Sequence, residues 1–369
     1  SYYLVTMYEP SSQKNYNIEP SISTSYEIGT EFRLFNNRLW GDFNYYTRDD
    51  KDQIISVTSA PQSGYSTRKM NAGLIRNRGV ELSLGGMPVS TKNWKWEMNF
   101  NIAKNSNKLV ELADGVDSYS IYWTSFTTRL YNYAMVGKSL GVITGNTWER
   151  DDNGNIIFHE LSASQKALYG GEYVPTYNQN TLDELGNFHP DFTGGFNTSI
   201  SFKNFRLSAN IDFSVGGQIV SYTNMWGSSS GILDKTAELN DRGVNVREPV
   251  SKGGGIHMTG VDQNGNKVDT YVNAKLYYTT ASRVWEEWVY DRTYVKLREV
   301  SLSYVFPSQT LKKLNIGLSR ASVAINASNP WLIYSACPNV DVSEIGMGYF
   351  EGGNAAATRS IGFTVNLAF

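Results

Sequence analysis

The chain has 369 residues and is nearly balanced in charge, with 33 Lys and Arg against 35 Asp and Glu and a formal net charge of −2. No basic run stands out, and a nucleic-acid-binding protein needs a concentrated positive surface, so we expect no nucleic-acid partner. The single cysteine, Cys337, excludes an internal disulfide and a paired-cysteine metal or redox motif.

The composition favours strands and turns over helices. Aromatic residues reach 13 %, and there are 33 Gly; aromatic side chains pack well on a pleated surface, and Gly serves turns. No apolar run approaches the roughly 18 residues of a membrane helix, whereas the alternating strands of a membrane barrel keep mean hydropathy low. The first residues, 1–5, do not resemble a signal peptide. We therefore expect a processed chain or, preferably, one piece of a longer protein.

Period-two alternation predicts the first strands. Apolar Ile28, Phe32 and Leu34 share one parity, and after a short link at Asn36-Asn37 the pattern resumes with Leu39, Gly41, Phe43 and Tyr45, facing away from Trp40, Asp42 and Asn44. A polar stretch over 58–75 follows. A further short link at Ser90 to Asn93 leads to a strand over 94–102, with Trp and Met alternating with Lys and Glu.

The long polar stretch 104–191 contains a string that resembles a catalytic motif. Gly137-Lys138-Ser139-Leu140-Gly141 matches the G-x-S-x-G nucleophile elbow, which requires a strand before the Ser and a helix after it. Here it lies in a loop of a β protein, so we expect no hydrolase and no enzyme. His159, His189 and His257 are far apart and lack metal-ligand spacing.

The segment 149–160 resembles an EF-hand calcium loop. Glu149, Asp151 and Asn153 stand at positions 1, 3 and 5, with Gly at position 6 and Glu160 at position 12. No amphipathic helices flank it, and Asn153-Gly154 is also a strong hairpin-turn signal. A plain turn is the preferred interpretation, calcium is the alternative, and no other cofactor is expected.

Clustered rings in the long loops are candidates for cargo contact, because aromatic faces stack on sugar rings and pack against peptide side chains. The alternative, given equal weight for any single ring, is that long loops need small cores of their own. The predicted substrate-binding residues are Tyr122, Trp123, Phe126, Trp148, Trp226, Trp285 and Trp288.

The second half repeats the strand pattern. Strands over 196–202 and 205–213 are joined by a short link at Lys203-Asn204, and a strand over 295–306 changes parity after Leu297, which predicts a bulge. A link at Pro307 to Lys313 precedes a predicted strand over 314–325, with a similar change of phase. The segment 360–369 alternates strictly over about ten residues, the length of a tilted strand that crosses a bilayer.

Short links and long polar stretches alternate along the chain, as in outer-membrane barrels, where short turns lie on one side of the membrane and long loops on the other. The predictions sum to about nine antiparallel strands. Aromatic residues beside the short turns should lie at one depth, the lipid headgroup boundary, and polar side chains should line the lumen. The aromatic residues are Phe35, Trp40, Trp94, Trp96, Phe202, Phe205, Phe306 and Phe369, and the lumen residues include Asp42, Asn44, Lys95, Glu97, Arg206 and Asp212.

Several stretches resemble the late barrel of SusC/RagA-type TonB-dependent outer-membrane transporters of Bacteroidetes. They run in order over nearly the whole chain, although Asn329-Pro330-Trp331 departs from an Asn-Leu pair that is frequent in the family. The stretches are Tyr26 to Tyr46, Asp52-Gln53-Ile54, Gly64-Tyr65, Asn71 to Leu82, Val136 to Gly141, Pro190 to Phe196, Gly216-Gly217 and Val295 to Tyr304.

The resemblance implies an all-β fold: residues 1–369 would form the C-terminal part, about nine strands, of a 22-stranded transmembrane β-barrel with long extracellular loops. The plug domain and the N-terminal barrel strands would lie outside this chain. It further implies energisation through TonB, a SusD-like surface lipoprotein as partner, contact with outer-membrane lipid, and import of oligosaccharides or peptides. A non-transporting barrel that serves as adhesin or scaffold is the alternative.

Overall fold

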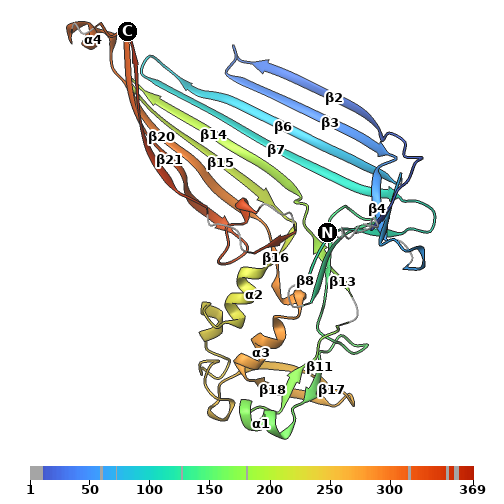
Figure 1. Ribbon diagram of the computed structural model, residues 1–369. Helices are drawn as coiled ribbons and strands as arrows, with labels where there is room; N and C mark the ends of the chain where they lie inside the picture. The colour runs from blue at the N-terminus through green and yellow to red at the C-terminus, as the bar shows by residue number, and fades with distance from the viewer. Residues whose placement is uncertain are drawn as a thin grey trace, which may run out of the picture.

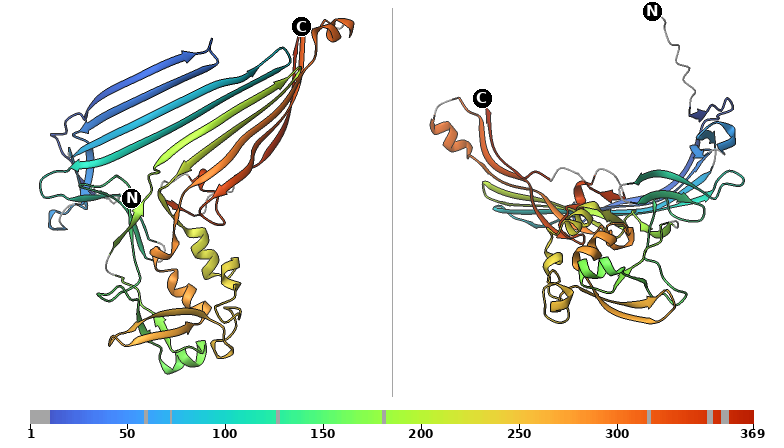
Figure 2. Two further views of the ribbon diagram at one scale, coloured as in Figure 1. Left: turned by 180° about the vertical axis from the view of Figure 1, so that it is seen from behind. Right: turned by 60° about the horizontal axis from the view of Figure 1, so that its bottom comes forward.

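A large antiparallel sheet forms the body of the protein. The computed structural model describes residues 11–58, 61–71, 73–125, 128–179, 182–314, 317–345, 349–352 and 357–369. Nine strands pair in the order β2-β3-β6-β7-β14-β15-β20-β21-β23 to give one curved layer (Figures 1 and 2). They are β2 (Ile22–Leu34), β3 (Leu39–Lys51), β6 (Leu74–Ser90), β7 (Trp94–Glu111), β14 (Phe192–Phe202), β15 (Phe205–Val215), β20 (Tyr294–Val305), β21 (Arg320–Ser335) and β23 (Ser360–Ala368).

Every neighbouring pair in this sheet is antiparallel and consecutive among its nine strands, as the sequence pattern predicted. Short connections at 35–38, 91–93 and 203–204 join strands at one end, and the long segments lie at the other end (Figure 1). Tight turns require little chain, whereas the long segments have enough residues to fold into structure of their own.

The register places apolar side chains on one face. Phe100, Phe196, Ile211 and Leu297 lie directly opposite one another across four strands. A second row on the same face contains Ile200, Leu207, Leu302, Ile325 and Phe363. Phe363 is 68 % exposed and Leu207 46 %. A β-sandwich would bury such a face against a second sheet; here the described residues leave it uncovered, as expected for strands that face lipid.

The opposite face is polar. Glu97 is in one row with Ser199, Ser208 and Ser301, and Lys95 is in another with Ser201 and Arg206. A third row joins Asp42, Ser83, Asn101 and Asp212. The polar residues predicted to share one face therefore do so.

Aromatic residues gather at the short-turn end of the apolar face. Trp94 and Phe202 lie with ring centroids 4.3 Å apart, and Phe205 and Tyr304 follow at 4.7 Å. One assignment was wrong: Trp40 does not belong to this band. Trp40 pairs with Gly85, and its indole covers that glycine on the polar face. Successive residues of a strand point to opposite faces, and the next residue, Gly41, belongs to the apolar face.

The predicted parity change in β20 is a bulge. Asn210 pairs with Glu299 and Ile211 with Leu297, so Arg298 is the extra residue. The strand predicted over 314–325 was wrong at its start, since α4 (Ser308–Leu314) occupies the connection and β21 begins only at Arg320; Ile316 lies outside the described residues. None of the helices in the described ranges is both long and apolar enough to span a bilayer.

The long segments fold into a compact assembly that we call the loop cap, formed by the described residues of 112–191, 216–293 and 336–352 (Figure 1). Its three small sheets contain β8 (Ser118–Ser125), β9 (Arg129–Met135), β10 (Val142–Gly145) and β13 (Asp183–Asn187); β11 (Ile157–Glu160), β12 (Tyr173–Pro175), β17 (Ile256–Asp262) and β18 (Lys267–Val272); and β16 (Gln218–Ser221), β19 (Val289–Asp291) and β22 (Phe350–Glu351).

Short helices complete the loop cap, and a separate small sheet lies beside it. The helices are α1 (Ala163–Tyr169), α2 (Tyr222–Ser229) and α3 (Ala274–Ala281), with 3-10 turns η2 (Asp234–Ala237), η3 (Val250–Lys252), η4 (Trp285–Trp288) and η5 (Val342–Glu344). The small sheet contains β1 (Ser12–Gln13), β4 (Ile54–Thr58) and β5 (Thr67–Asn71), with η1 (Pro61–Ser63) between β4 and β5.

The loop cap has a hydrophobic core of its own, built from segments distant in sequence. Leu130 and Ile143 from the first long loop pack with Met225, Trp285 and Trp288 from the second. Burial of these side chains stabilises the loops by roughly 1.5–3 kcal/mol for each large residue before the cost of ordering. The loops are therefore held as one body above the end of the sheet.

Candidate functional site

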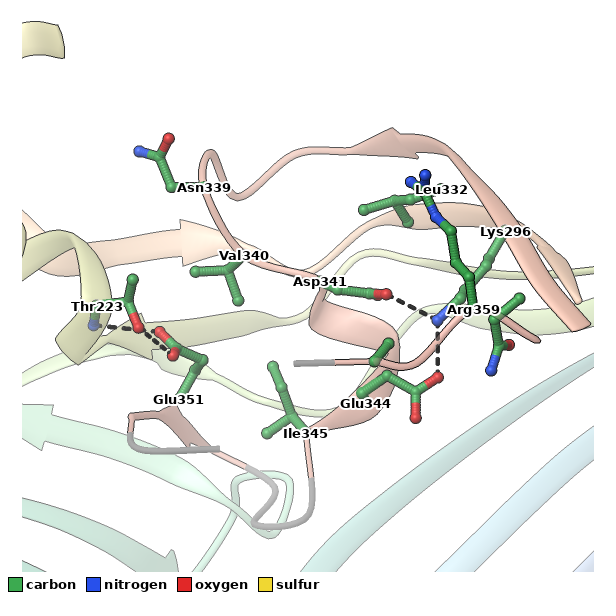
Figure 3. Close-up of a pocket in the computed structure, with 12 residues that line it drawn as sticks. Thr223, Lys296, Leu332, Asn339, Val340, Asp341, Glu344, Ile345, Glu351 and Arg359 are labelled. Carbon is green, nitrogen blue, oxygen red and sulfur yellow. Dashed lines mark hydrogen bonds and ion pairs between the residues drawn. The ribbon is translucent and has the colours of Figure 1, made fainter. Parts of the chain in front are cut away.

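The junction between the polar face and the loop cap contains a cavity of about 410 Å³. Strands β20 and β21 form one wall of the cavity, and the described residues of 336–352, which we call the roof segment, form the other (Figure 3). Figure 3 shows Lys296 on one side of it and Glu351 on the other.

Lys296 is the centre of an ion-pair network on the wall formed by the strands. Its side chain is 2 % exposed, and its Nζ donates to Asp341 Oδ2 at 2.7 Å, Glu344 Oε1 at 2.7 Å and Ser343 Oγ at 3.0 Å. Arg298 joins Glu344 to Asp212 on the neighbouring strand, with 2.9 Å between Arg298 Nε and Asp212 Oδ1. The network fastens the roof segment to the wall of the sheet.

The acidic members of this network are held in their charged form. Burial opposes ionisation of Asp341, but hydrogen bonds from Lys296 and Ser343 outweigh it and lower the pKa of the carboxyl. A hydrogen bond from Lys296 likewise lowers the pKa of Glu344. Both effects favour the ionised carboxylates.

Two irregularities in the strands place these groups. Lys296 and Arg298 both reach the network, as expected for residues i and i+2 of a strand, and Arg298 is also the unpaired residue of the bulge. Opposite it, Asn329 adopts a left-handed conformation with φ 48° immediately before Pro330, and β21 is bulged there too. Asn329 also lines the cavity.

Glu351 forms the second polar centre. It is 5 % exposed and accepts hydrogen bonds from Ser221 Oγ at 2.8 Å, from the Thr223 backbone N–H at 3.3 Å and from the Thr223 hydroxyl. These donors lie at the start of α2, where Ser221 is the N-cap. Across the cavity, Arg359 is exposed and forms no ion pair within the described part of the chain. The walls thus present both signs of charge.

Three predicted ring residues lie inside the loop cap. Trp285, Trp288 and Trp148 are 0 %, 1 % and 2 % exposed. Trp288 Nε1 donates to Ala281 O at 2.7 Å, and Trp148 Nε1 donates to Glu287 Oε1 at 2.6 Å. Their burial shows that they hold the loops together and leaves no free ring face for cargo in this arrangement.

Tyr122 and Trp226 differ from those three, because they are 43 % and 45 % exposed. Tyr122 contacts the rings of Tyr349 and Phe350, with centroids 5.8 and 6.2 Å away. The side chain of Trp123 and the whole of Phe126 lie outside the described residues. Cargo contact stays a prediction for Tyr122 and Trp226.

The 149–160 segment is a hairpin turn in this structure. Asp151 Oδ1 accepts from the backbone N–H groups of Asn153 and Asn155, and Oδ2 accepts from Asn155 Nδ2 at 2.9 Å. These hydrogen bonds, the one from the Asn155 side chain first, lower the pKa of Asp151. Glu160 pairs with Lys166 of α1. The described residues contain no cluster of three His, Cys, Asp or Glu side chains that could hold a metal.

The same turn occurs again at 262–266, where Asp262 accepts from Asn264 and Asn266 in the same way. Both turns share the sequence Asp-x-Asn-Gly-Asn, and both belong to the sheet of β11, β12, β17 and β18. An Asx turn accounts for the repeated sequence, because its Asp carboxylate accepts backbone N–H groups of the turn, and calcium binding at 149–160 stays a prediction.

Ser139, His189 and His257 each contact other side chains. Ser139 lies between β9 and β10, two strands, and its hydroxyl donates to Asn107 Oδ1 at 2.8 Å. His189 stacks on Phe188, and burial lowers its pKa. His257 lies between Asp241 and Asp269, while His159 is exposed on β11. The strand-to-helix geometry of a nucleophile elbow is absent at Ser139.

Sequence reasoning missed the network of Lys296, Asp341 and Glu344, and it missed Glu351. Lys296 stands on the polar parity of its strand, which the alternation could have indicated. Its partners lie about 45 residues away in a loop, and no local pattern shows that such a loop folds back over the strand.

Comparison with known proteins assigns the chain to a family. Residues 3–218 match the family model described as TonB dependent receptor-like, beta-barrel. The chain is 28 % identical over 335 residues to TonB-dependent receptor P3 of Formosa agariphila, covering 89 % of this chain and 31 % of that protein. It is 30 % identical over 225 residues to TonB-dependent receptor SusC of Bacteroides thetaiotaomicron, covering 58 % and 21 %.

Solved structures agree with the fold. The RagAB peptide importer in its closed-closed state superposes with a TM-score of 0.67 at 18 % identity, covering 95 % of this chain and 35 % of that one, and its open-open state gives 0.66. The chain spans about a third of the length of TonB-dependent receptor P3 and of the RagAB chain. Membership of the family implies an outer-membrane location, and the fold is that of a partial barrel, with no closed barrel in this structure. The chain belongs to the TonB-dependent receptor-like β-barrel family.

Proposed function

We propose that the protein to which this chain belongs imports nutrients across the bacterial outer membrane as a SusC-like, TonB-dependent transporter and is not an enzyme. The observation that carries the proposal is the sheet itself: one apolar face left uncovered, one polar face, and a folded loop cap at one end. An uncovered apolar face suits lipid, and a polar face suits a hydrated lumen.

Cargo and partners belong to the same proposal. A neighbour named as a peptide importer supports peptides as cargo, and the resemblance to SusC/RagA-type transporters adds oligosaccharides as the other candidate. We infer that TonB supplies the energy, that a SusD-like lipoprotein covers the loop cap, and that the rest of the barrel and a plug complete the lumen. Tyr122 and Trp226 are the ring residues that we propose for cargo contact, because each keeps an exposed face.

The test is uptake by living cells. A strain lacking the gene is supplied with labelled oligosaccharide and peptide pools, with and without a TonB deletion. We expect cell-associated label to fall in the gene deletion and in the TonB deletion alike, and to return on complementation. Surface binding that persists without TonB, combined with unchanged uptake in the gene deletion, would contradict import and favour an adhesin or scaffold.

A further inference from the structure

A second cavity, of about 460 Å³, lies within the loop cap, away from the junction described above. The end of α1, the end of α2 and the start of α3 surround it, so two different long loops contribute to its walls. Figures 1 and 2 show these helices in the part of the molecule remote from the short-turn end of the sheet. The volume lies within the usual range of small-ligand sites, roughly 300–1,000 Å³.

Two cations line this cavity without a counterion. Arg247 and Lys275 are both exposed, and neither forms an ion pair with a carboxylate of the described residues. Arg247 is nevertheless held in place, because its Nε donates to Thr236 O at 2.8 Å and its Nη2 donates to Gly231 O. Neutral carbonyl oxygens orient the guanidinium but do not cancel its charge. Its outer nitrogen, Nη1, remains available to an anion.

The rest of the lining suits a polyhydroxylated molecule. Ser229 and Ser230 contribute hydroxyl-bearing residues to the walls, and Tyr169 contributes a partly exposed ring. The Thr236 hydroxyl is buried and already used, since it donates to Leu233 O and accepts from Arg247 Nη2. The Tyr278 hydroxyl is already used, since it donates to Lys235 O at 3.1 Å. Hydroxyls can donate and accept, which matches the hydroxyls of a sugar, and a tyrosine face can pack on a pyranose ring.

We propose that this cavity binds a negatively charged sugar, a hexuronate residue of an acidic glycan. Its carboxylate meets Arg247 and Lys275, its hydroxyls meet the serines, and one ring face lies on Tyr169. An acidic peptide would also satisfy the cations, but the partly exposed Tyr169 ring in the same lining suits the flat face of a pyranose, so the lining favours the sugar. The inference goes beyond import, because it concerns binding at the outer surface and needs no transport step.

The experiment is calorimetric titration of the intact detergent-purified transporter with matched probes. The acidic probe is a trisaccharide of β-1,4-linked glucuronic acid, its neutral counterpart is cellotriose, and the peptide probe is triglutamate. We expect the acidic trisaccharide to bind at least about tenfold more tightly than cellotriose or triglutamate, and more weakly as salt rises. Equal binding of the two sugars would overturn the proposal, and tighter binding of triglutamate would replace the sugar with a peptide.

Variants locate the binding. R247A and K275A each remove one cation, and each should weaken the acidic trisaccharide by about tenfold without changing the binding of cellotriose. K252A removes the same charge from η3, outside the cavity lining, and should leave binding unchanged. R247K retains the charge but loses the planar fork and should give an intermediate loss. Correct folding is checked by unchanged heat-modifiable migration in gel electrophoresis. If both alanine variants bind the acidic trisaccharide as tightly as the natural protein does, the proposal is wrong.

Discussion

At the scale of single residues, charge and burial explain why the loop segment 336–352 stays on the sheet. Lys296 is almost fully buried and is satisfied only because Asp341, Ser343 and Glu344 all accept from it. A buried ion pair is a modest source of net stability, but removing one partner is costly because the remaining charges lose their compensation. The position of the roof segment therefore depends on Lys296.

Replacing Lys296 by Met should release the roof segment. The change retains the bulk of the stem but leaves Asp341 without its cation and Glu344 with Arg298 alone; the partial exposure of both carboxylates limits the expected loss to about 2–3 kcal/mol. Limited proteolysis should show faster cleavage within 336–352. Lys275→Met, in the loop cap but outside the network, is the control; equal cleavage of both variants would show that Lys296 does not hold the roof.

The same network predicts a dependence on pH. The pKa values of Asp341 and Glu344 are lower in the folded protein than in the unfolded chain, so their stabilising contribution is complete above about pH 4–5 and is lost as pH falls through the folded values. Cleavage of the roof segment should therefore rise below about pH 4 in the natural protein. In Lys296→Met this acid-dependent step should be smaller, because only Arg298 and Ser343 then favour the ionised carboxylates, and an undiminished step there would assign it to other groups.

At the scale of elements, register explains which substitutions the strands tolerate. A Cβ at Gly194 of β14 would lie 2.3 Å from the backbone oxygen of Asn101 on the adjacent strand and 2.5 Å from the Phe213 ring. A Cβ at Gly362 of β23 would meet nothing within 4 Å. Both residues have ordinary strand conformations, so the difference comes from packing alone.

Gly194→Ala should destabilise the barrel by about 1–3 kcal/mol, because two paired backbones cannot separate without loss of ladder hydrogen bonds. Gly362→Ala is the matched control and should change stability by less than about 0.5 kcal/mol. Urea unfolding followed by heat-modifiable migration measures both variants. Equal stability of the two would mean that β7 and β14 are not in the register described.

At the scale of the whole molecule, the orientation of the two faces decides location and function together. Leu207 lies in an apolar row and its neighbour Ser208 in a polar row of the same strand. If the apolar face contacts lipid, then water-soluble reagents reach position 208 but not position 207. This contrast tests the barrel without requiring knowledge of the cargo.

Cysteine labelling in intact cells measures that contrast. Ser208→Cys should react with a water-soluble maleimide and Leu207→Cys should not, while a lipid-dissolved quencher should reach only a probe at position 207. The natural Cys337 makes a quiet background, because it is 1 % exposed and burial raises the pKa of its thiol to about 12, which leaves little thiolate. Water-soluble labelling of both positions would show that the apolar face does not meet lipid.

Much of the architecture follows from local pattern. Alternation along 94–102 or 205–213 reports a strand and its two faces, because side chains in a strand have period two. Asn36-Asn37 and Lys203-Asn204 indicate tight turns between strands. Such turns require backbone conformations that few residue types adopt, and Asn36, Asn37 and Lys203 indeed have positive φ. The pattern did not distinguish the strand expected from Leu314 from the helix α4, since a short apolar spacing suits both.

The sequence alone thus determined the strands, their polarity, their approximate number and the membrane character of the sheet, since each depends on neighbours along the chain. Only the tertiary structure decided the roles of single side chains. Trp285 and Trp226 both lie in long polar stretches of the sequence, yet Trp285 is buried in the loop cap and Trp226 is half-exposed. Lys296 pairs with Asp341, and Arg247 has no carboxylate partner among the described residues, because loops fold back across long separations along the chain. Such contacts leave no periodic pattern in the sequence.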